Sequence, residues 1–95
     1  MILCGIEAHA CIYHTCLELI ADHGLDVHVL VDCCSSRSLV ERKYAFEAVK
    51  EAGAFLATSE RIILSLAPDA AHPKFRQLQK LIMDNALDTG LLSHL

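Results

Sequence analysis

The sequence predicts an α/β fold with three parallel strands and flanking helices. Short apolar runs alternate with segments of helical periodicity, and a glycine or a capping residue stands at most of the expected boundaries. Strands that alternate with helices are joined by right-handed crossovers, which make the sheet parallel. A chain of 95 residues is the length of one small domain or of part of a larger one. We take residues 1–95 as one partial domain.

The three expected strands are Ile2–Ile6, Asp26–Asp32 and Ala54–Thr58. The first would be an apolar edge strand whose backbone groups are unpaired on one side. Both faces of the second strand are largely apolar, which is typical of a parallel strand covered on both sides. His28 lies in the middle of it, and we expect a core histidine with satisfied ring nitrogens.

Residues 8–23 predict the first helix, because apolar side chains recur there at intervals of three and four. Gly24 is a typical residue just beyond a helix end. The face that should turn inward comprises Ile12, Cys16, Leu19, Ile20 and His23.

Ser38 and Glu41 match a capping box, so a second helix should begin there and extend to Ala52, before Gly53. Its inward face is expected to consist mainly of small side chains, namely Ala45, Ala48, Val49 and Ala52.

The last third of the sequence predicts two shorter helices. Ser59 should cap the helix Glu60–Leu66, and an amphipathic helix should follow at Lys74–Met83. Pro68 and Pro73 bracket the loop between them. We expect residues 84–95 to form a loose tail.

Composition and charge exclude several classes of protein. The net charge is −4 and the eight Lys and Arg residues are scattered, whereas nucleic-acid binding needs clustered basic residues. No apolar stretch is long enough to span a membrane, and no basic segment of signal-peptide type precedes the first strand. Five cysteines without regular spacing favour free thiols in a reducing compartment. We therefore expect a cytoplasmic protein with no nucleic-acid or membrane partner.

Cys11 is the strongest candidate for a nucleophile. It follows the first strand after a glycine and a tight turn, in the first turn of the expected helix. Sites in parallel sheets lie at the carboxyl ends of strands, and a helix N-terminus favours the thiolate form of a cysteine. The alternative is a purely structural role, in which Cys11 is a small buried hydrophobic residue, as free cysteines often are.

The segment Gly5–Ile12 (GIEAHACI) resembles the nucleophile motif of isochorismatase-like cysteine hydrolases. The resemblance continues through residues 31–38 (VDCCSSRS), 53–60 (GAFLATSE) and 72–82 (HPKFRQLQKLI). The last two segments are similar to the eukaryotic isochorismatase domain-containing proteins in particular. The resemblance covers nearly the whole chain, in order.

This resemblance implies the C-terminal half of a three-layer α/β/α sandwich, in which the chain supplies the last three of six parallel strands. It also implies an Asp–Lys–Cys triad with Cys11 as the nucleophile and a cis peptide between Ile6 and Glu7. The backbone N–H groups of Glu7 and Cys11 would form the oxyanion hole. The full domain would hydrolyse an amide, ester or enol ether of an unknown small molecule, and we expect no cofactor.

The chain departs from the family pattern in one respect. The family's Asp and Lys lie upstream of the matching segments, and neither Asp22 nor Asp32 falls on the position of the family's Asp. Without its base, Cys11 loses the partner that activates it. An alternative hypothesis is a truncated, non-catalytic isoform that serves as an interaction or dimerisation module, bound to a full-length relative or a second copy. A thiol redox module is disfavoured because no C-x-x-C motif occurs.

Other candidates for site lining are His9, His14 and Cys33. The spacing H-x-C-x-x-H around Cys11 does not place three ligands on one helical face, so we expect no metal. Adjacent cysteines rarely bond each other, so Cys33 and Cys34 should be free thiols, packed or lining the site. Cys4 and Cys16 are expected in the core.

The sequence ends in Ser93-His94-Leu95, which resembles the peroxisomal Ser-Lys-Leu signal with His in place of Lys. A peroxisomal location is therefore an alternative to the cytoplasm.

Overall fold

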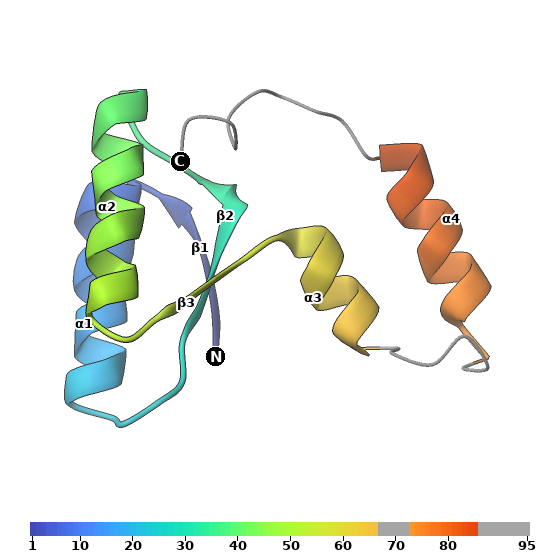
Figure 1. Ribbon diagram of the computed structural model, residues 1–95, viewed down its shortest axis with the longest axis horizontal. Helices are drawn as coiled ribbons and strands as arrows, with labels where there is room; N and C mark the ends of the chain where they lie inside the picture. Colours follow the sequence, from blue (N-terminus) through green and yellow to red (C-terminus); the bar gives the residue numbers. More distant parts are fainter. Residues whose placement is uncertain (67–72, 86–95) are drawn as a thin grey trace.

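A computed structural model of the chain describes residues 1–66 and 73–85. Its elements are β1 (Ile2–Ile6), a short π-helix η1 (Ala8–Ile12), α1 (Tyr13–Ala21), β2 (His28–Ser35), α2 (Leu39–Glu51), β3 (Phe55–Ala57), α3 (Ser59–Leu66) and α4 (Phe75–Asn85). Within the described ranges the strands form one parallel sheet in the order β1-β2-β3 (Figure 1). The predicted fold class is confirmed.

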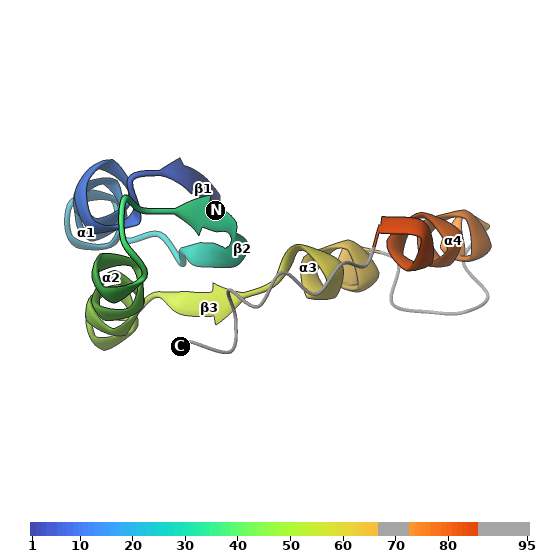
Figure 2. The ribbon, with the colours of Figure 1, turned by 90° about the horizontal axis from the view of Figure 1, so that it is seen from above.

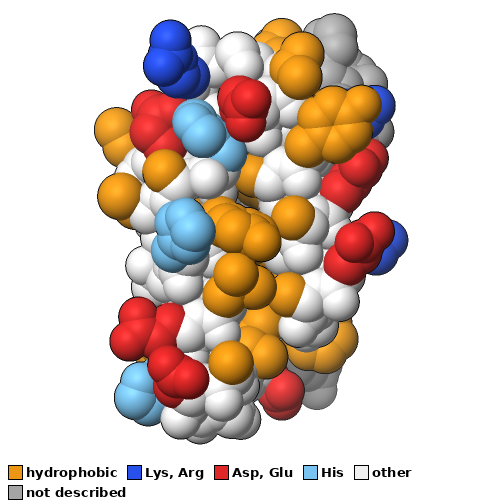
Figure 3. Space-filling view, turned by 90° about the vertical axis from the view of Figure 1, so that its left-hand side faces the viewer, with side chains coloured by type: hydrophobic (Ala, Val, Ile, Leu, Met, Phe, Trp, Pro, Cys, Tyr) orange, Lys and Arg blue, Asp and Glu red, His pale blue; other side chains and the backbone are white. Residues whose placement is uncertain are grey.

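Two helices, α1 and α2, lie side by side against one face of the sheet, whereas α3 and α4 extend away on the other side (Figure 2). The core lies between the sheet and the first pair of helices. Val27, Val29 and Val31 all point into it. Its largest fully buried side chain is Phe46 of α2. Seen from outside, hydrophobic side chains also follow the seam between the two helices (Figure 3).

The opposite face of the sheet is only partly covered by the described residues, which bury Leu30 and Ala57 there. Side chains of β1 alternate, so Leu3 packs against the core while Ile2 and Ile6 are 49% and 67% exposed. On β3, Phe55 is 51% exposed. Hydrophobic side chains at this density on one sheet face are typical of a surface that contacts another element or partner.

The caps of the helices follow their local sequence. The Ser38 hydroxyl accepts a hydrogen bond from the Glu41 N–H at 3.2 Å, so the predicted cap of α2 is confirmed. Gly53 follows α2 with a φ of 108°, a backbone conformation that favours glycine. The predicted cap of α3 is wrong. Thr58 accepts from the Arg61 N–H at 3.2 Å, while Ser59 binds Asp32 instead.

A bulge separates the two halves of the β1–β2 pairing. Leu3 pairs with Val29 and Gly5 pairs with Cys34, so residues 30–33 of β2 lie opposite Cys4 alone. Such a bulge interrupts the hydrogen bonds of the sheet. The side chain of Arg42, only 2% exposed, donates from Nε to the Cys34 carbonyl at 3.1 Å and from a terminal nitrogen to the Val31 carbonyl. Arg42 thereby provides donors for carbonyls at the bulge.

Several predicted orientations are wrong in informative ways. His23 is exposed because α1 ends at Ala21. Ala48 and Ala52 are only half-buried, since α2 turns Arg42 and Phe46 inward beside Ala45 and Val49. The second strand spans 28–35 rather than 26–32 because the bulge lengthens it.

His28 and Cys4 also differ from expectation because both belong to the uncovered face. The His28 ring stacks on Phe55 with centroids 5.0 Å apart, and its buried Nδ1 has no hydrogen-bond partner among the described residues. It is therefore not a satisfied core histidine. Cys4 is exposed and not in the core.

Some predictions lie outside the described residues, namely Pro68, residues 86–95 of the expected tail and the Ser93–Leu95 signal. The helix α4 continues to Asn85, two residues beyond its predicted end. Among the described residues, no helix is both long and apolar enough to cross a membrane.

Candidate functional site

The turn after β1 presents Cys11 to solvent. The Ile6–Glu7 peptide bond is cis, where the resemblance places it, and Glu7 precedes η1 in an extended conformation. The Glu7 carbonyl accepts from the N–H groups of Ala10 and Ile12, both at 3.1 Å. The Cys11 N–H, which lies between these two donors in the sequence, does not donate to the Glu7 carbonyl. Cys11 itself is exposed at the carboxyl end of β1.

Burial of its neighbours fixes how this turn is oriented. Ala8 and Ile12 are 1% and 6% exposed and belong to the core cluster. Gly5 lies beneath them with a φ of 133°, and a Cβ on it would be 3.4 Å from Cδ1 of Ile12. Because Ile12 packs onto the strand at Gly5, the next residue back, Cys11, is turned toward solvent.

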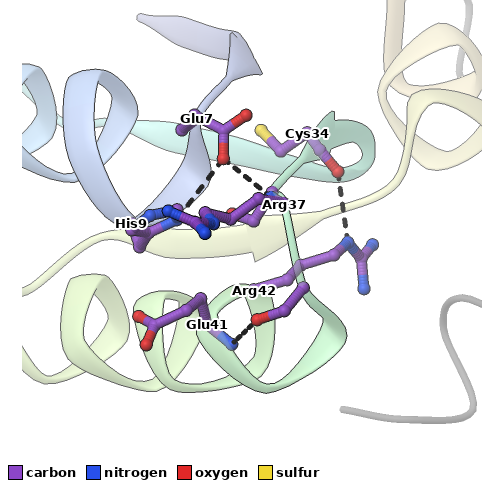
Figure 4. Close-up of polar contacts among 8 residues, drawn as sticks. Glu7, His9, Cys34, Arg37, Glu41 and Arg42 are labelled. Carbon is purple, nitrogen blue, oxygen red and sulfur yellow. Dashed lines mark hydrogen bonds and ion pairs between the residues drawn. The ribbon is translucent and has the colours of Figure 1, made fainter.

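The Glu7 side chain joins this turn to the loop that follows β2 (Figure 4). Its Oε2 accepts from the Arg37 N–H at 2.7 Å and lies 3.7 Å from Nδ1 of His9. The same His9 nitrogen is 3.0 Å from the Ser36 hydroxyl. These contacts connect the carboxyl ends of two neighbouring strands, the usual position of a site in a parallel sheet.

The other cysteines differ from Cys11 in their surroundings. Burial raises the pKa of Cys16 in α1 and of Cys34 in β2, and both belong to the core. Cys33 is exposed, but partial burial and the negative charge of Asp32 raise its pKa as well. A raised pKa lowers the fraction of reactive thiolate at neutral pH. These three thiols are therefore poorer nucleophiles than an unperturbed cysteine.

Asp32 and Ser59 connect the end of β2 to the start of α3. One Asp32 oxygen accepts from the Ser59 N–H at 2.9 Å and the other accepts from the Ser59 hydroxyl. Partial burial raises the pKa of Asp32, but these hydrogen bonds outweigh it and hold the pKa below its ordinary value. The carboxylate at the start of α3 also suits the positive end of that helix.

The structure brings together only some of the candidates. His9 joins the cluster with Glu7 and Ser36. His14 is exposed and its ring contacts the ring of Tyr13, with centroids 5.1 Å apart. Cys33 lies beside Asp32 at the end of β2. Among the described residues, no group of three His, Cys, Asp or Glu side chains is arranged to hold a metal ion.

Sequence reasoning considered Glu7 only for its backbone and missed its side-chain bond to the Arg37 N–H. It also missed Arg42. The available signal for Glu7 was a carboxylate at the end of one strand and a serine-rich loop at the end of the next, which share one edge of a parallel sheet.

Comparisons with known proteins identify the family of the chain. The family model of the isochorismatase domain matches residues 1–61. Isochorismatase domain-containing protein 2 of Macaca fascicularis is 58% identical over 97% of this chain and 44% of its own length. The protein of the same name from Xenopus laevis is 55% identical over 98% of this chain and 45% of its own length.

A solved structure, described as the MAR1 ribonuclease from Caenorhabditis elegans, superposes with a TM-score of 0.86. It is 52% identical, and the match covers 95% of this chain and 46% of that one. The chain thus spans less than half the length of these relatives. With the family model matched over most of its residues, the chain belongs to the isochorismatase family.

Proposed function

We propose that this chain contributes the nucleophilic cysteine of an isochorismatase-like hydrolase, with Cys11 in that role. The observation that carries the proposal is the exposed Cys11 at the carboxyl end of β1. Its turn is fixed because the Glu7 carbonyl accepts two backbone hydrogen bonds and because Ala8 and Ile12 are buried in the core. The raised pKa values of Cys16, Cys33 and Cys34 support the choice of Cys11 over these three thiols.

In the proposed reaction, the Cys11 thiolate attacks the carbonyl carbon of a small amide or ester. The oxygen becomes an anion that accepts hydrogen bonds from the N–H groups of Glu7 and Cys11. The carbonyl reforms as the leaving group departs with a proton, which gives a thioester, and water then hydrolyses that thioester. His9 contacts both Glu7 and Ser36. In this proposal, His9 and Ser36 line the substrate site beside the turn.

The base for this reaction is the missing part. The resemblance implies an Asp and a Lys upstream of the matching segments, and this chain covers less than half the length of its relatives. We propose that full activity requires that portion, either in the same polypeptide or as a second chain. The chain alone should show at most slow thiol chemistry.

Alkylation tests the nucleophile. The reduced chain is treated briefly with iodoacetamide at neutral pH, and each cysteine is quantified by peptide mass spectrometry. Cys11 should be modified faster than Cys33, because both thiols are exposed and the pKa of Cys33 is raised. Faster modification of Cys33 or Cys34 would show that the assignment is wrong.

A hydrolysis assay tests the reaction class. The chain is mixed with the portion of the Caenorhabditis elegans relative that the match does not cover, and is supplied with small amides and esters. Cys11→Ser should abolish turnover while Cys4→Ser, at another exposed thiol, retains it. An RNA oligonucleotide belongs in the same panel, because that relative is described as a ribonuclease. RNA cleavage without ester or amide hydrolysis would replace the proposed substrate class.

The second candidate is a non-catalytic interaction module, favoured by one observation. The uncovered sheet face exposes Ile2 and Ile6 on β1, which is an edge strand among the described residues, and Phe55 on β3. A free strand edge with apolar side chains is a typical surface for added strands. Here the partner would be a full-length relative or a second copy.

Sedimentation and intact mass distinguish the two candidates. A concentration-dependent dimer that Ile2→Asp disrupts, but Val40→Asp on exposed α2 does not, would favour the module if hydrolysis is absent. In cell extract, a native intact mass near 10.4 kDa would show the short chain as a product. A mass about twice that would favour the hydrolase, because the relatives are about twice as long.

A further inference from the structure

The side chain of Glu7 has no role in the proposed hydrolysis, which uses only the backbone N–H of that residue. Its Oε2 nevertheless accepts a hydrogen bond from the Arg37 N–H at 2.7 Å and lies 3.7 Å from Nδ1 of His9 (Figure 4). Hydrogen bonds to an ionised acceptor are short and about twice as strong as neutral ones. The Glu7 carboxylate thus contacts two segments that are far apart in the sequence, namely the turn after β1 and the loop after β2.

Few other hydrogen bonds join this turn to this loop. The pairing of β1 with β2 ends at Ile6 and Ser35. Beyond it, the described residues provide two hydrogen bonds between the turn and the loop, the one that Glu7 accepts and one between His9 and the Ser36 hydroxyl at 3.0 Å. Loss of the carboxylate would therefore remove one of these two bonds directly.

The main chain of Glu7 fixes the turn as well. Its carbonyl accepts from the N–H groups of Ala10 and Ile12, both at 3.1 Å. A displacement of Glu7 would therefore disturb the start of η1 and move the N–H that is proposed as an oxyanion donor. Such donors act only at hydrogen-bond distance from the developing charge, and a misplacement of about 1 Å can lower a rate about 100-fold. The side chain is thus placed to control the position of that N–H.

The charge of Glu7 also affects which nitrogen of the His9 ring carries the proton. Nδ1 lies 3.0 Å from the Ser36 hydroxyl and 3.7 Å from the carboxylate. A lone pair on Nδ1 would face the negative charge, whereas an Nδ1–H group is attracted to it and can donate to the hydroxyl oxygen. In neutral His9 the proton therefore belongs on Nδ1.

We propose that Glu7 is a positioning residue for the nucleophile turn and acts through its carboxylate. The carboxylate holds the loop after β2 against the turn through the Arg37 N–H, and it keeps neutral His9 in the Nδ1–H form that donates to Ser36. The effect on catalysis rests on the proposed hydrolysis and would act through the backbone N–H groups of the turn. The contacts themselves require no substrate, so they are tested first on the 95-residue chain alone.

Hydrogen exchange followed by NMR tests the contact with the loop. Glu7→Gln keeps an oxygen acceptor and removes the charge, whereas Glu7→Ala removes both. Glu47→Ala is the control, because Glu47 is exposed on α2 and its side chain has no hydrogen bond or ion pair within the described part of the chain. In Glu7→Ala the Arg37 amide should exchange about tenfold faster or more, as expected when a hydrogen bond to a charged group is lost. The amides of Ala10 and Ile12 should also exchange faster, and Glu7→Gln should restore part of the protection.

Three outcomes of this experiment would overturn the proposal. The Arg37 amide could be unprotected in the unsubstituted chain, or it could exchange equally in Glu7→Ala and Glu47→Ala. The third is an equal acceleration of the Val29 amide, in the central strand of the sheet, which would show only a loss of global stability.

The 15N shifts of the His9 ring test the role of the charge. They are recorded about two pH units above the ordinary histidine pKa of about 6.5, where an unperturbed ring is neutral. The unsubstituted chain should show the proton on Nδ1, and Glu7→Gln should show a larger share on Nε2. A ring that carries its proton mainly on Nε2 in the unsubstituted chain would overturn the proposal, and this result does not depend on whether Glu7→Ala folds.

The hydrolysis assay with the two combined portions tests the effect on catalysis. Glu7→Ala should lower kcat about 10- to 100-fold with little change in KM, because the oxyanion contact is made only in the transition state. Glu7→Gln should lose less, and Glu47→Ala should turn over like the unsubstituted chain. Equal turnover of Glu7→Ala and Glu47→Ala, where Cys11→Ser is inactive, would overturn the positioning role and leave the proposed hydrolysis intact. Turnover by Cys11→Ser would instead refute the proposed hydrolysis, and the exchange and ring measurements would then decide the contacts of Glu7 on their own.

Discussion

The two faces of the sheet differ in what they contribute to the molecule. The face beneath α1 and α2 buries Val29, Phe46 and Val49 almost completely. The other face leaves Ile2, Ile6 and Phe55 about half exposed or more. Burial of apolar surface is the main favourable term in folding. The first face therefore stabilises this chain, and the second retains apolar area that only a further element or a partner could bury.

The largest expected effect comes from testing this difference with the same residue type on each face. Phe46→Ala should lower the free energy of unfolding by about 3–5 kcal/mol, because it leaves a cavity in the core. Phe55→Ala should lower it by at most about 1.5 kcal/mol, mainly through the lost stacking on His28. Urea denaturation followed by circular dichroism measures both.

Similar losses for the two variants would contradict the comparison, because they would show that the exposed face is buried in solution. In that case the stability of Phe55→Ala should also depend on protein concentration, as expected when a second copy covers this face.

The next largest effect is expected at Arg42, a charged residue of α2 whose side chain is buried against β2. Arg42→Met keeps much of the apolar volume but removes the donors to the Val31 and Cys34 carbonyls. Carbonyls left buried without a donor cost about 1–3 kcal/mol, so stability should fall by that amount in urea denaturation. Arg37→Met is the control, because Arg37 is exposed and its bond to Glu7 uses the backbone N–H. A more stable Arg42→Met variant would show that burying the charge costs more than its bonds contribute.

These residues also show how far the sequence could predict the structure. Periodicity correctly gave the parallel strands, the start of the first helix and the Ser38 cap, because those depend on neighbours in sequence. Arg42 could not be predicted, since its carbonyl partners become available only through a bulge between distant strands. The partner of His28 and the exposure of Cys4 depend on what covers the second face. For the site, the motif indicated Cys11 and His9, but the bond from Arg37 to Glu7 joins residues 30 positions apart.

A smaller effect is expected at the start of α2. Ser38→Ala removes the acceptor of the Glu41 N–H and should lower the free energy of unfolding by about 1 kcal/mol. Ser65→Ala, an exposed serine that bonds only to the Ile62 carbonyl within α3, is a matched control and should be nearly neutral. Equal effects of the two substitutions would mean that the cap contributes no more than an ordinary surface hydroxyl.

The smallest effect is the pH dependence at Asp32, where β2 connects to α3. The pKa of Asp32 is lower in the folded chain than its ordinary value of 3.8, so the folded state binds protons more weakly than the unfolded state. The resulting stability is fully present above that value and is lost as the pH falls through the lower, folded value. Because Asp32 is exposed, solvent screening should keep the contribution below about 1 kcal/mol.

Asp32→Asn retains an acceptor for the Ser59 N–H but has no charge, so it should be slightly less stable than the unsubstituted chain at neutral pH. The two unfolding curves should converge as the pH is lowered toward 3, on the order of the ordinary carboxyl value. A difference that is independent of pH would assign the effect to hydrogen-bond geometry, and α3 would then be attached to the sheet by a neutral contact.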